Sequence, residues 1–485
     1  MFYTISILFL FSLITLLSLL ALHLSRLRAS MIAVIARDIP KQSSIFGADS
    51  LLNRFMPPIS GVLLGIDYSW LSKYKRYQQW NVHFTISFWP GRISLWLADA
   101  KAIKAVSSSR RKFPKPVDLY AVLEVFGPNI ISSEDSEWKK FRKISGAAFS
   151  DRNTKLVWDS TCDVMTTLMI GPWRGQTLIS IEHVDTLTLQ IALSVLASAA
   201  FGKPTESIGS SSHRMSFRDS LHMVASNMWI KLGFPSWMIY IHPQYRCILQ
   251  AFNELEQYMI EMIADRRDAG KGSTSDDLFG LLLAANEEYD INSQVKLNDR
   301  ELRGNLFVFL LGGHEGSAHT MSFMFGLLAL HQDIQDKLYQ NITQVLGSRD
   351  PTYEDIKHIP YAMAIVNETL RLFPPVNVIP KRSAEDTSLI VCNNGVSTTI
   401  PVPKGMDVYI DTVGLHYNPQ YWHDPEKFHP ERFLDDWPRD AFLPFGSGSR
   451  MWHRKESGLK DSSLTPPSHS FETLNLKAEN PWYGN

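Results

Sequence analysis

The sequence predicts a mainly α-helical protein with a small β region, preceded by one N-terminal transmembrane helix. Three observations lead to this prediction. Residues 2–24 form an apolar run that contains no Asp, Glu, Lys or Arg. Between Pro114 and Leu372, most windows of the sequence show the apolar spacing of helices. After Pro374 the pattern changes to short β-rich runs that are separated by turn residues.

The apolar run from Phe2 to Leu24 is long enough to cross a bilayer core of about 30 Å as a helix. A cleaved signal peptide, the alternative, predicts a shorter apolar run, a basic start and a small-residue cleavage site. Here nothing basic precedes the run, and Arg26, Arg28, Arg37 and Lys41 follow it. Because basic flanks stay in the cytosol, we expect a single-pass anchor with the body of the protein facing the cytosol.

The composition of the body is ordinary for a globular protein. The 485 residues carry a net charge of −1, which argues against nucleic acid as a partner. The three cysteines, Cys162, Cys247 and Cys392, show no paired spacing, so neither a zinc site nor a disulfide framework is expected. No clear linker divides the body, which predicts one large domain.

Local patterns predict the elements of the body in chain order. Residues 83–99, HFTISFWPGRISLWLAD, predict a hairpin, and residues 100–113 predict a helix that ends before Pro114. Residues 297–332 predict one long buried helix, because they are apolar on nearly every face and include a capping residue, Asn298 or Asp299, near their start. The runs SLIVC, VSTTIPV and MDVYIDTV predict short strands.

Two adjacent glycines interrupt the long helix in GGHEGSAHT, residues 312–320. Each glycine costs about 1 kcal/mol relative to alanine. Either another helix approaches closely there, or the helix opens locally where a ligand meets its backbone. Glu315 and Ser317 stand beside the glycines, and buried polar groups need partners or a purpose. A zinc site of the HExxH type is excluded, because position 318 is Ala318 and His319 comes one residue late.

Two further groups of charged residues are candidates for a site. In NETLRLFPP, Glu368 and Arg371 share one helical face between apolar flanks, so we expect a buried pair, with Arg432 of FHPERF as a candidate third member. In EWKKFR, Trp138 and Arg142 share one face and together suit a carboxylate, although an ordinary amphipathic helix is the alternative.

Taken together, these residues resemble the cytochrome P450 haem-thiolate monooxygenases in their membrane-anchored eukaryotic form. The resemblance runs from the anchor to about Arg450 and rests on EWKKFR, GGHEGS, ETLR, IPVPKG, FHPERF and PFGSGSR in the family's order. It implies a P450 fold around haem b, electrons from NADPH through a reductase, and insertion of one atom of O₂ into an apolar small molecule. It also implies attachment to the endoplasmic reticulum membrane.

The resemblance assigns roles to individual residues. Contacts with the cofactor are implied for Trp138, Arg142, Gly312, Gly313, Phe445, Gly448 and Arg450, of which Trp138, Arg142 and Arg450 hold the haem propionates. A buried structural triad is implied for Glu368, Arg371 and Arg432. The catalytic positions, on a kinked helix over the distal face of the haem, are implied for Glu315, Gly316 and Ser317.

The sequence departs from the family at the catalytic helix. The family usually has threonine directly after the acidic residue, and the threonine hydroxyl helps to deliver protons. Gly316 takes this place here, and Ser317 lies about 100° further round the helix. We therefore expect weaker proton delivery, which a water molecule beside Gly316 could restore.

A second departure concerns the metal ligand. The family's loop reads F-x-x-G-x-R-x-C-x-G, and Trp452 stands where the cysteine belongs, with Arg454 at the next glycine. An indole has no lone pair for iron. The imidazole of His453 could bind haem iron, but neighbouring residues of a tight loop point in different directions. We therefore expect no protein ligand to the metal.

Residues 452–485 match nothing in the family and lack the amphipathic helix expected behind the ligand loop. A single substitution would leave the downstream pattern intact, whereas a change of reading frame would not. One G inserted into TGC ATC GGN, a coding of Cys-Ile-Gly, gives TGG CAT CGG, which codes Trp-His-Arg. A retained intron would also give an unrelated tail.

The sequence thus predicts an anchor at residues 2–24, a linker at 25–50, a P450-like haem domain at 51–451 and an aberrant tail at 452–485. The predicted function is that of a P450 monooxygenase whose activity is impaired because Trp452 replaces the cysteine ligand. The alternative is a truncated, inactive membrane-anchored protein.

Overall fold

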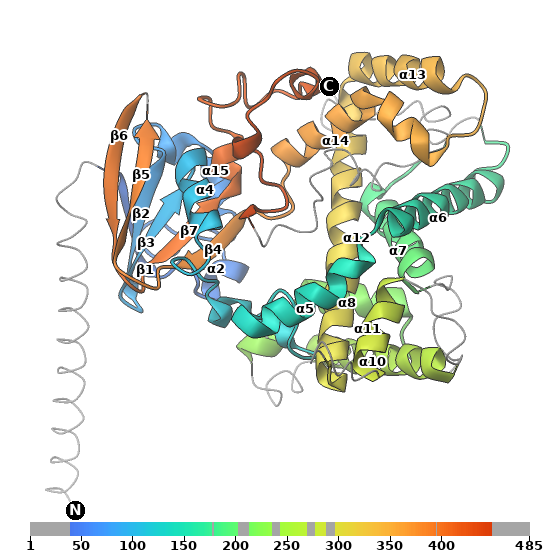
Figure 1. Ribbon diagram of the computed structural model, residues 1–485, viewed down its shortest axis with the longest axis horizontal. Coiled ribbons are helices and arrows are strands. Elements are labelled where there is room, and N and C mark those ends of the chain that lie inside the picture. Colours follow the sequence, from blue (N-terminus) through green and yellow to red (C-terminus); the bar gives the residue numbers. More distant parts are fainter. Residues whose placement is uncertain are drawn as a thin grey trace, which may run out of the picture. The chain divides into compact units, whose positions relative to one another are not determined.

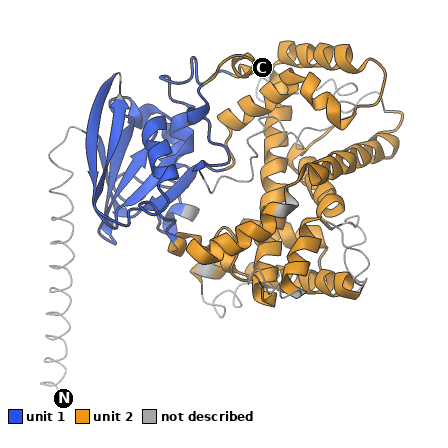
Figure 2. Ribbon diagram, viewed as in Figure 1, with its two compact units in different colours: residues 1–116, 376–427, 438–451 blue, residues 117–375, 428–437, 452–485 orange. Residues whose placement is uncertain are grey.

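The computed structural model describes residues 39–176, 179–201, 213–234, 243–268, 277–287, 296–393 and 395–448. These residues form two compact units, each assembled from segments that are far apart in the sequence (Figure 2). Unit 1 contains the described parts of residues 1–116, 376–427 and 438–451, and unit 2 those of 117–375 and 428–437. No linker is visible in the sequence because the chain passes between the units several times.

Unit 1 contains the β region (Figure 1). Its strands are β1 (Lys41–Phe46), β2 (Val82–Trp89), β3 (Arg92–Leu97), β4 (Val378–Arg382), β5 (Thr387–Asn393), β6 (Val396–Val402) and β7 (Asp407–Asp411). Five strands form one sheet in the order β1-β2-β3-β7-β4, whereas β5 and β6 pair separately. Its helices are α2 (Leu52–Phe55), α3 (Tyr68–Ser72), α4 (Ala100–Ser108) and α15 (Thr412–His416), with 3-10 turns η1 (Lys75–Tyr77) and η6 (Arg439–Ala441).

The hairpin expected at residues 83–99 is confirmed as β2 and β3, and the three later runs are confirmed as β5, β6 and β7. Residues 41–46, which we assigned to the linker, instead form β1 and pair with β2. The sequence KQSSIF is mostly polar, so it carries little strand signal. The helix expected to reach residue 113 ends at Ser108, where a run of three serines lowers helix propensity.

Unit 2 is almost entirely helical. Its helices are α5 (Asp135–Ala148), α6 (Asp151–Ile170), α7 (Val184–Phe201), α8 (Phe217–Gly233), α10 (Pro243–Asp268), α11 (Leu278–Glu287), α12 (Asp299–Leu330), α13 (Gln332–Leu346) and α14 (Pro360–Leu372). The 3-10 turns among its described residues are η2 (Val117–Glu124), η4 (Tyr353–His358) and η5 (Pro430–Phe433). Figure 1 shows α12 running through the middle of this unit, in agreement with its contacts to α7, α10, α11, α13 and α14.

The long buried helix is confirmed as α12. Its N-cap is Asn298, whose side chain accepts a hydrogen bond from the N–H of Glu301 while the carboxylate of Glu301 accepts one from the N–H of Asn298. This reciprocal capping box satisfies N–H groups that the first helical turn would leave unpaired. The N-terminal half of α12 packs into the main apolar cluster of the unit, which includes Leu306, Phe307 and Leu310.

Within the described residues, none of the helices has both the length and the apolar character needed to cross a membrane. The expected anchor, Phe2–Leu24, lies outside these residues, as do Arg450 and the tail from Trp452 onward.

Candidate active site

Helix α5 carries the predicted carboxylate-binding pair. The indole of Trp138 is buried, and the guanidinium of Arg142, one turn later, is half-buried. Burial lowers the pKa of Arg142. Among the residues that the structure describes, none forms a hydrogen bond or ion pair with Arg142, although half-buried charges normally have a partner. This unpaired cation fits the carboxylate of a bound group.

Helix α12 runs without interruption from Asp299 to Leu330, so the local opening that we considered at the two glycines is absent. The close-approach alternative holds at Gly313, where a Cβ atom would lie 3.1 Å from Cδ1 of Leu196 on α7. Gly312 is exposed on another face of the helix. A Cβ atom on Gly316 would meet nothing within 4 Å, so open space lies beside this residue.

Glu315 is half-buried on α12, and burial raises its pKa. No described residue gives its carboxyl group a hydrogen bond or an ion pair. The hydroxyl of Ser317 is buried and donates to the carbonyl oxygen of Gly313 at 3.0 Å. Ser317 therefore satisfies the backbone of its own helix and does not occupy the space beside Gly316.

The residues Glu368, Arg371 and Arg432 form one buried cluster. Arg371 donates from Nε and one terminal nitrogen to the two carboxylate oxygens of Glu368, at 2.7 and 2.8 Å. Arg432 on η5 donates from Nε to Oε1 of Glu368 at 3.1 Å, and the N–H of His429 donates to the same oxygen at 2.9 Å. The side chains of Glu368 and Arg371 are 0% exposed and that of Arg432 is 10% exposed.

The cluster fastens η5 to α14, because its hydrogen bonds join residues more than sixty positions apart. A bidentate pair inside a protein stays stable only when its other donors and acceptors are also satisfied.

The described part of the predicted ligand loop ends at Gly448. The residue has φ +73°, and a Cβ atom there would lie 2.5 Å from the carbonyl oxygen of Ser107 at the end of α4. Only glycine suits this backbone conformation and this close contact. Phe445 is half-buried three residues earlier. The rest of the loop, including Arg450 and Trp452, lies outside the described residues.

The sequence analysis missed a second close approach on α12. A Cβ atom on Gly304 would lie 2.4 Å from the carbonyl oxygen of Gly127, and Asn305 accepts a hydrogen bond from the N–H of Ile130 at 3.0 Å. The ring of Phe126 meets Phe307 edge-on, with centroids 4.8 Å apart. These contacts fix residues 126–130 against α12. A glycine within a long apolar helix was the signal that could have revealed them.

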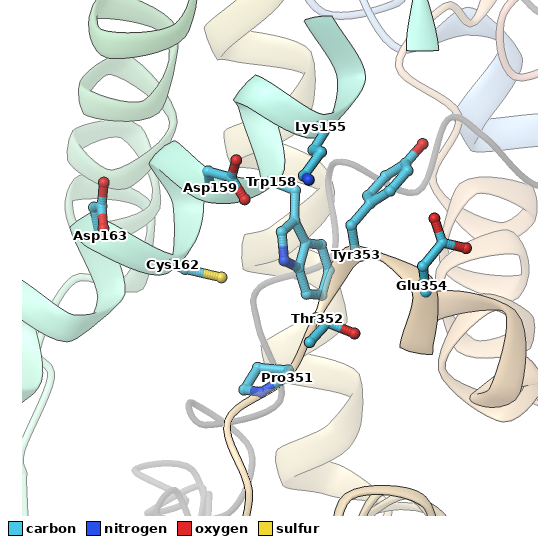
Figure 3. A pocket seen from close by; sticks show the side chains of 9 residues that line it. All are labelled: Lys155, Trp158, Asp159, Cys162, Asp163, Pro351, Thr352, Tyr353 and Glu354. Atoms are coloured by element: carbon cyan, nitrogen blue, oxygen red, sulfur yellow. The ribbon is translucent and has the colours of Figure 1, made fainter. Parts of the chain in front are cut away.

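A groove of about 490 Å³ lies between α6 and the start of η4, and Figure 3 shows side chains from both segments facing it. It contains none of the predicted site residues. Its lining comprises Lys155, Trp158, Asp159, Cys162, Asp163, Pro351, Thr352, Tyr353 and Glu354.

Comparison with known proteins adds to this geometry. The sequence model of the cytochrome P450 family matches residues 58–451, so the match ends directly before Trp452. Cytochrome P450 monooxygenase 124 of Postia placenta is 45% identical over 374 residues, which cover 76% of this chain and 72% of that protein. Cytochrome P450 monooxygenase prx9 of Penicillium rubens is 30% identical over 398 residues, 76% of this chain and 68% of that protein. The cyclooctat-9-en-7-ol 5-monooxygenase of Streptomyces melanosporofaciens is 28% identical over 369 residues, 75% and 76% of the two chains.

Proposed function

The chain belongs to the cytochrome P450 family, and from this premise we propose that it descends from a haem-dependent monooxygenase acting on an apolar small molecule. The observation that carries the proposal is the family match across residues 58–451 together with relatives named monooxygenases. By family, the protein is an oxidoreductase. NADPH, through a reductase, is the proposed source of electrons.

The residues present fit one side of a haem group. The half-buried guanidinium of Arg142, with Trp138 one turn away, would hold a propionate. Haem supplies the chemistry of O₂ activation in this family. On α12, the half-buried carboxyl group of Glu315 stays protonated to higher pH than an exposed one and could hold a proton beside the open space at Gly316.

The metal ligand does not fit. Trp452 offers only an N–H donor, and no cysteine lies within the ligand loop. We therefore derive no catalytic step through the metal for this chain and propose that it is impaired as written. The end of the family match at Met451 supports a change of reading frame at this point.

We propose an apolar substrate because the resemblance to the family implies one. The relative whose name gives cyclooctat-9-en-7-ol as its substrate is consistent with this class.

The experiment that tests the proposal is a reduced, CO-bound absorption spectrum. The chain as written should lack the absorption of thiolate-ligated haem, because a thiolate is what confers it. A frame-restored chain, in which positions 452–454 read Cys-Ile-Gly and are followed by the downstream residues of that frame, should recover haem binding. Trp452→Cys alone should recover it only in part. A normal thiolate spectrum from the chain as written would refute both the frame argument and the assignment of Trp452 to the ligand position.

The alternative function is that of a truncated, inactive membrane protein that cells make in this form. Trp452 and the unmatched tail are the observations that favour it. Sequencing the transcript across the codon of Trp452 separates the two possibilities. A transcript that encodes cysteine there supports the monooxygenase, and one that encodes tryptophan supports the inactive protein.

We further propose that the protein is anchored in the endoplasmic reticulum membrane with its body in the cytosol. The uncharged run at residues 2–24 supports the anchor. Exposed apolar side chains on unit 1, among them Phe55, Ile66 and Trp89, support contact between this unit and lipid. Backbone hydrogen bonds tie their segments together, from Gly47 to Trp89 and from Ile66 to Met56.

Residues 25–38 can span at most about 50 Å, so the apolar side chains of unit 1 stay within reach of the bilayer. Carbonate washing of membranes should leave the full-length chain in the pellet. Release of the chain by carbonate, or protection of Lys41 from a reagent confined to the cytosolic side, would refute the proposed topology.

A further inference from the structure

Residues 213–216 lead into α8. The imidazole of His213 attaches this segment to α10. Its Nδ1 atom lies 2.8 Å from Oε2 of Glu254, and its Nε2 atom lies 3.0 Å from Oε2 of Glu261. The ring stacks on Tyr258, with centroids 3.7 Å apart and an interplanar angle of 17°. The imidazole is only 7% exposed, so these α10 side chains surround it.

The neutral and the protonated imidazole differ in how many of the two carboxylates they can donate a hydrogen bond to. A neutral imidazole has one N–H group and one lone pair, so it can donate to only one glutamate while its lone pair faces an oxygen of the other. An imidazolium donates to both and forms two charge-assisted hydrogen bonds. Burial lowers the pKa of His213, but the hydrogen bonds to Glu261 and Glu254 outweigh it and raise the pKa above its ordinary value. The hydrogen bond to His213 is the main cause that lowers the pKa of Glu254.

Neighbouring contacts extend this attachment to the start of α8. The N–H of Arg214 donates to Oε1 of Glu254 at 3.4 Å, and the hydroxyl of Tyr258 donates to the carbonyl oxygen of Met215 at 2.8 Å. Ser216 then caps α8 by accepting a hydrogen bond from the N–H of Asp219 at 3.1 Å. His213 is therefore the first of four consecutive residues that tie α8 to α10 or cap it.

Other charged groups around the cluster are few. The carboxylate of Asp219, on α8, contributes with Glu254 and Glu261 to raising the pKa of Tyr258, after burial as the main cause. The residue Arg214 is exposed. From α10, the described titratable groups that contact the imidazole are Glu254, Glu261 and Tyr258, so an imidazolium at His213 places a positive charge between two carboxylates.

We propose that His213 is a pH-dependent latch, whose imidazolium form fixes residues 213–216 and the first turn of α8 on α10 and whose neutral form releases them. The sign follows from the direction of the shift. A histidine whose pKa is raised on docking supports the docked state fully below the ordinary value of about 6.5 and loses this support as the pH rises through the raised value. Phe217 and Leu221 of α8 share an apolar cluster with Leu306 of α12, so release loosens the packing beside the helix that carries Glu315.

Hydrogen–deuterium exchange of the full chain in detergent tests the latch. Amides of residues 214–221 are followed at about pH 6 and about pH 8, with exchange times scaled to the intrinsic exchange rate at each pH. The wild type should lose about tenfold of its protection at the higher pH, as expected for the loss of one charge-assisted hydrogen bond. His213→Gln should show low protection at both values, because the amide keeps hydrogen-bonding capacity but cannot carry the charge.

Two further variants make the test specific. Glu261→Gln removes one partially exposed carboxylate, so the loss of protection should move to lower pH. His222→Gln changes an exposed histidine of α8 and should keep the wild-type pH dependence. Equal protection of the wild type at both values overturns the latch, and so does wild-type pH dependence in His213→Gln. If His213→Gln fails to fold, a loss of protection at an unchanged pH in Glu261→Gln overturns it instead.

Discussion

Replacement of Glu368 by alanine should destabilise unit 2 more than any surface substitution, because it leaves two arginines without their shared acceptor. Arg371 is 0% exposed and Arg432 is 10% exposed, so water cannot replace the lost carboxylate at Arg371. The N–H of His429 loses its acceptor as well. These partners lie on two segments, α14 and η5, that the carboxylate joins.

The magnitude follows from what remains buried after the change. Removal of one partner of a buried ion pair typically costs about 3–5 kcal/mol, since an uncompensated charge is left behind. The unpaired N–H of His429 adds about 1 kcal/mol if no other acceptor reaches it. Glu368→Gln keeps the volume and one acceptor oxygen, so it should cost about half as much. With both contributions, we expect Glu368→Ala to lower the free energy of unfolding by about 5 kcal/mol.

Urea unfolding of the detergent-solubilised chain, followed by tryptophan fluorescence, measures this loss as a shift of the midpoint. Glu354→Ala is the matched control, because Glu354 pairs with Lys357 at the same three-residue spacing but both side chains are more than half exposed. Exposed pairs contribute about 0–1 kcal/mol, so this variant should unfold close to the wild type. Equal midpoints for Glu368→Ala and Glu354→Ala would refute the argument that the buried cluster fastens η5 to α14.

Further predictions concern backbone contacts, a buried carboxyl group and proton supply. Gly304→Ala should lower the free energy of unfolding in urea by about 1–3 kcal/mol, because its Cβ would lie 2.4 Å from a backbone carbonyl oxygen. Gly326→Ala is the control on the same helix and should be neutral or stabilising, because a Cβ there would meet nothing within 4 Å. Equal effects of the two variants would contradict the close approach at Gly304. Burial raises the pKa of Asp411 to about 6, so the folded protein resists ionisation of this carboxyl group. As the pH rises from about 4 to above 6, the free energy of unfolding of the wild type should fall by about 3 kcal/mol relative to that of Asp411→Asn. A constant difference between the two urea midpoints would contradict this. In the frame-restored chain, Gly316→Thr should raise the ratio of product to peroxide, because a hydroxyl would enter the open space beside Glu315; an unchanged ratio would indicate that ordered water already supplies the protons.

Local patterns predicted those features whose cause lies within one element. The spacing of Glu368 and Arg371 predicted a buried pair on one helical face, and the capping sequence at Asn298 predicted where α12 begins. The third member, Arg432, lies sixty-four positions from Glu368, so its contact depends on how the chain returns to α14. The need of a buried charge for more partners made Arg432 a candidate, but no local signal could show that it reaches Glu368.

Contacts between distant segments explain most of what the sequence did not predict. The glycines at 312–313 left a close approach and a local opening both possible, and only the structure shows that Gly313 packs against Leu196 of a different helix while α12 stays helical. The approach of Gly127 to Gly304 was not predicted, because the glycine within the long apolar helix indicates a close contact but does not identify the distant segment that makes it. Strand β1 was assigned to a linker because its polar residues owe their conformation to pairing with β2.

The unpaired groups of the candidate site bear on how Trp452 arose. Arg142 and Glu315 are half-buried ionisable side chains, and no described residue forms a hydrogen bond or ion pair with either of them. A buried ionisable group without a partner destabilises a fold, and a bound ligand that pairs with the group would offset this destabilisation. A protein adapted to a structural role without cofactor gains nothing from them, and the substitution of either by an apolar residue of similar size would stabilise it. Among the described residues, Arg142 and Glu315 are therefore groups that would suit a bound cofactor, and together with a family match that runs to residue 451 they support our proposal of one abrupt change of reading frame at Trp452.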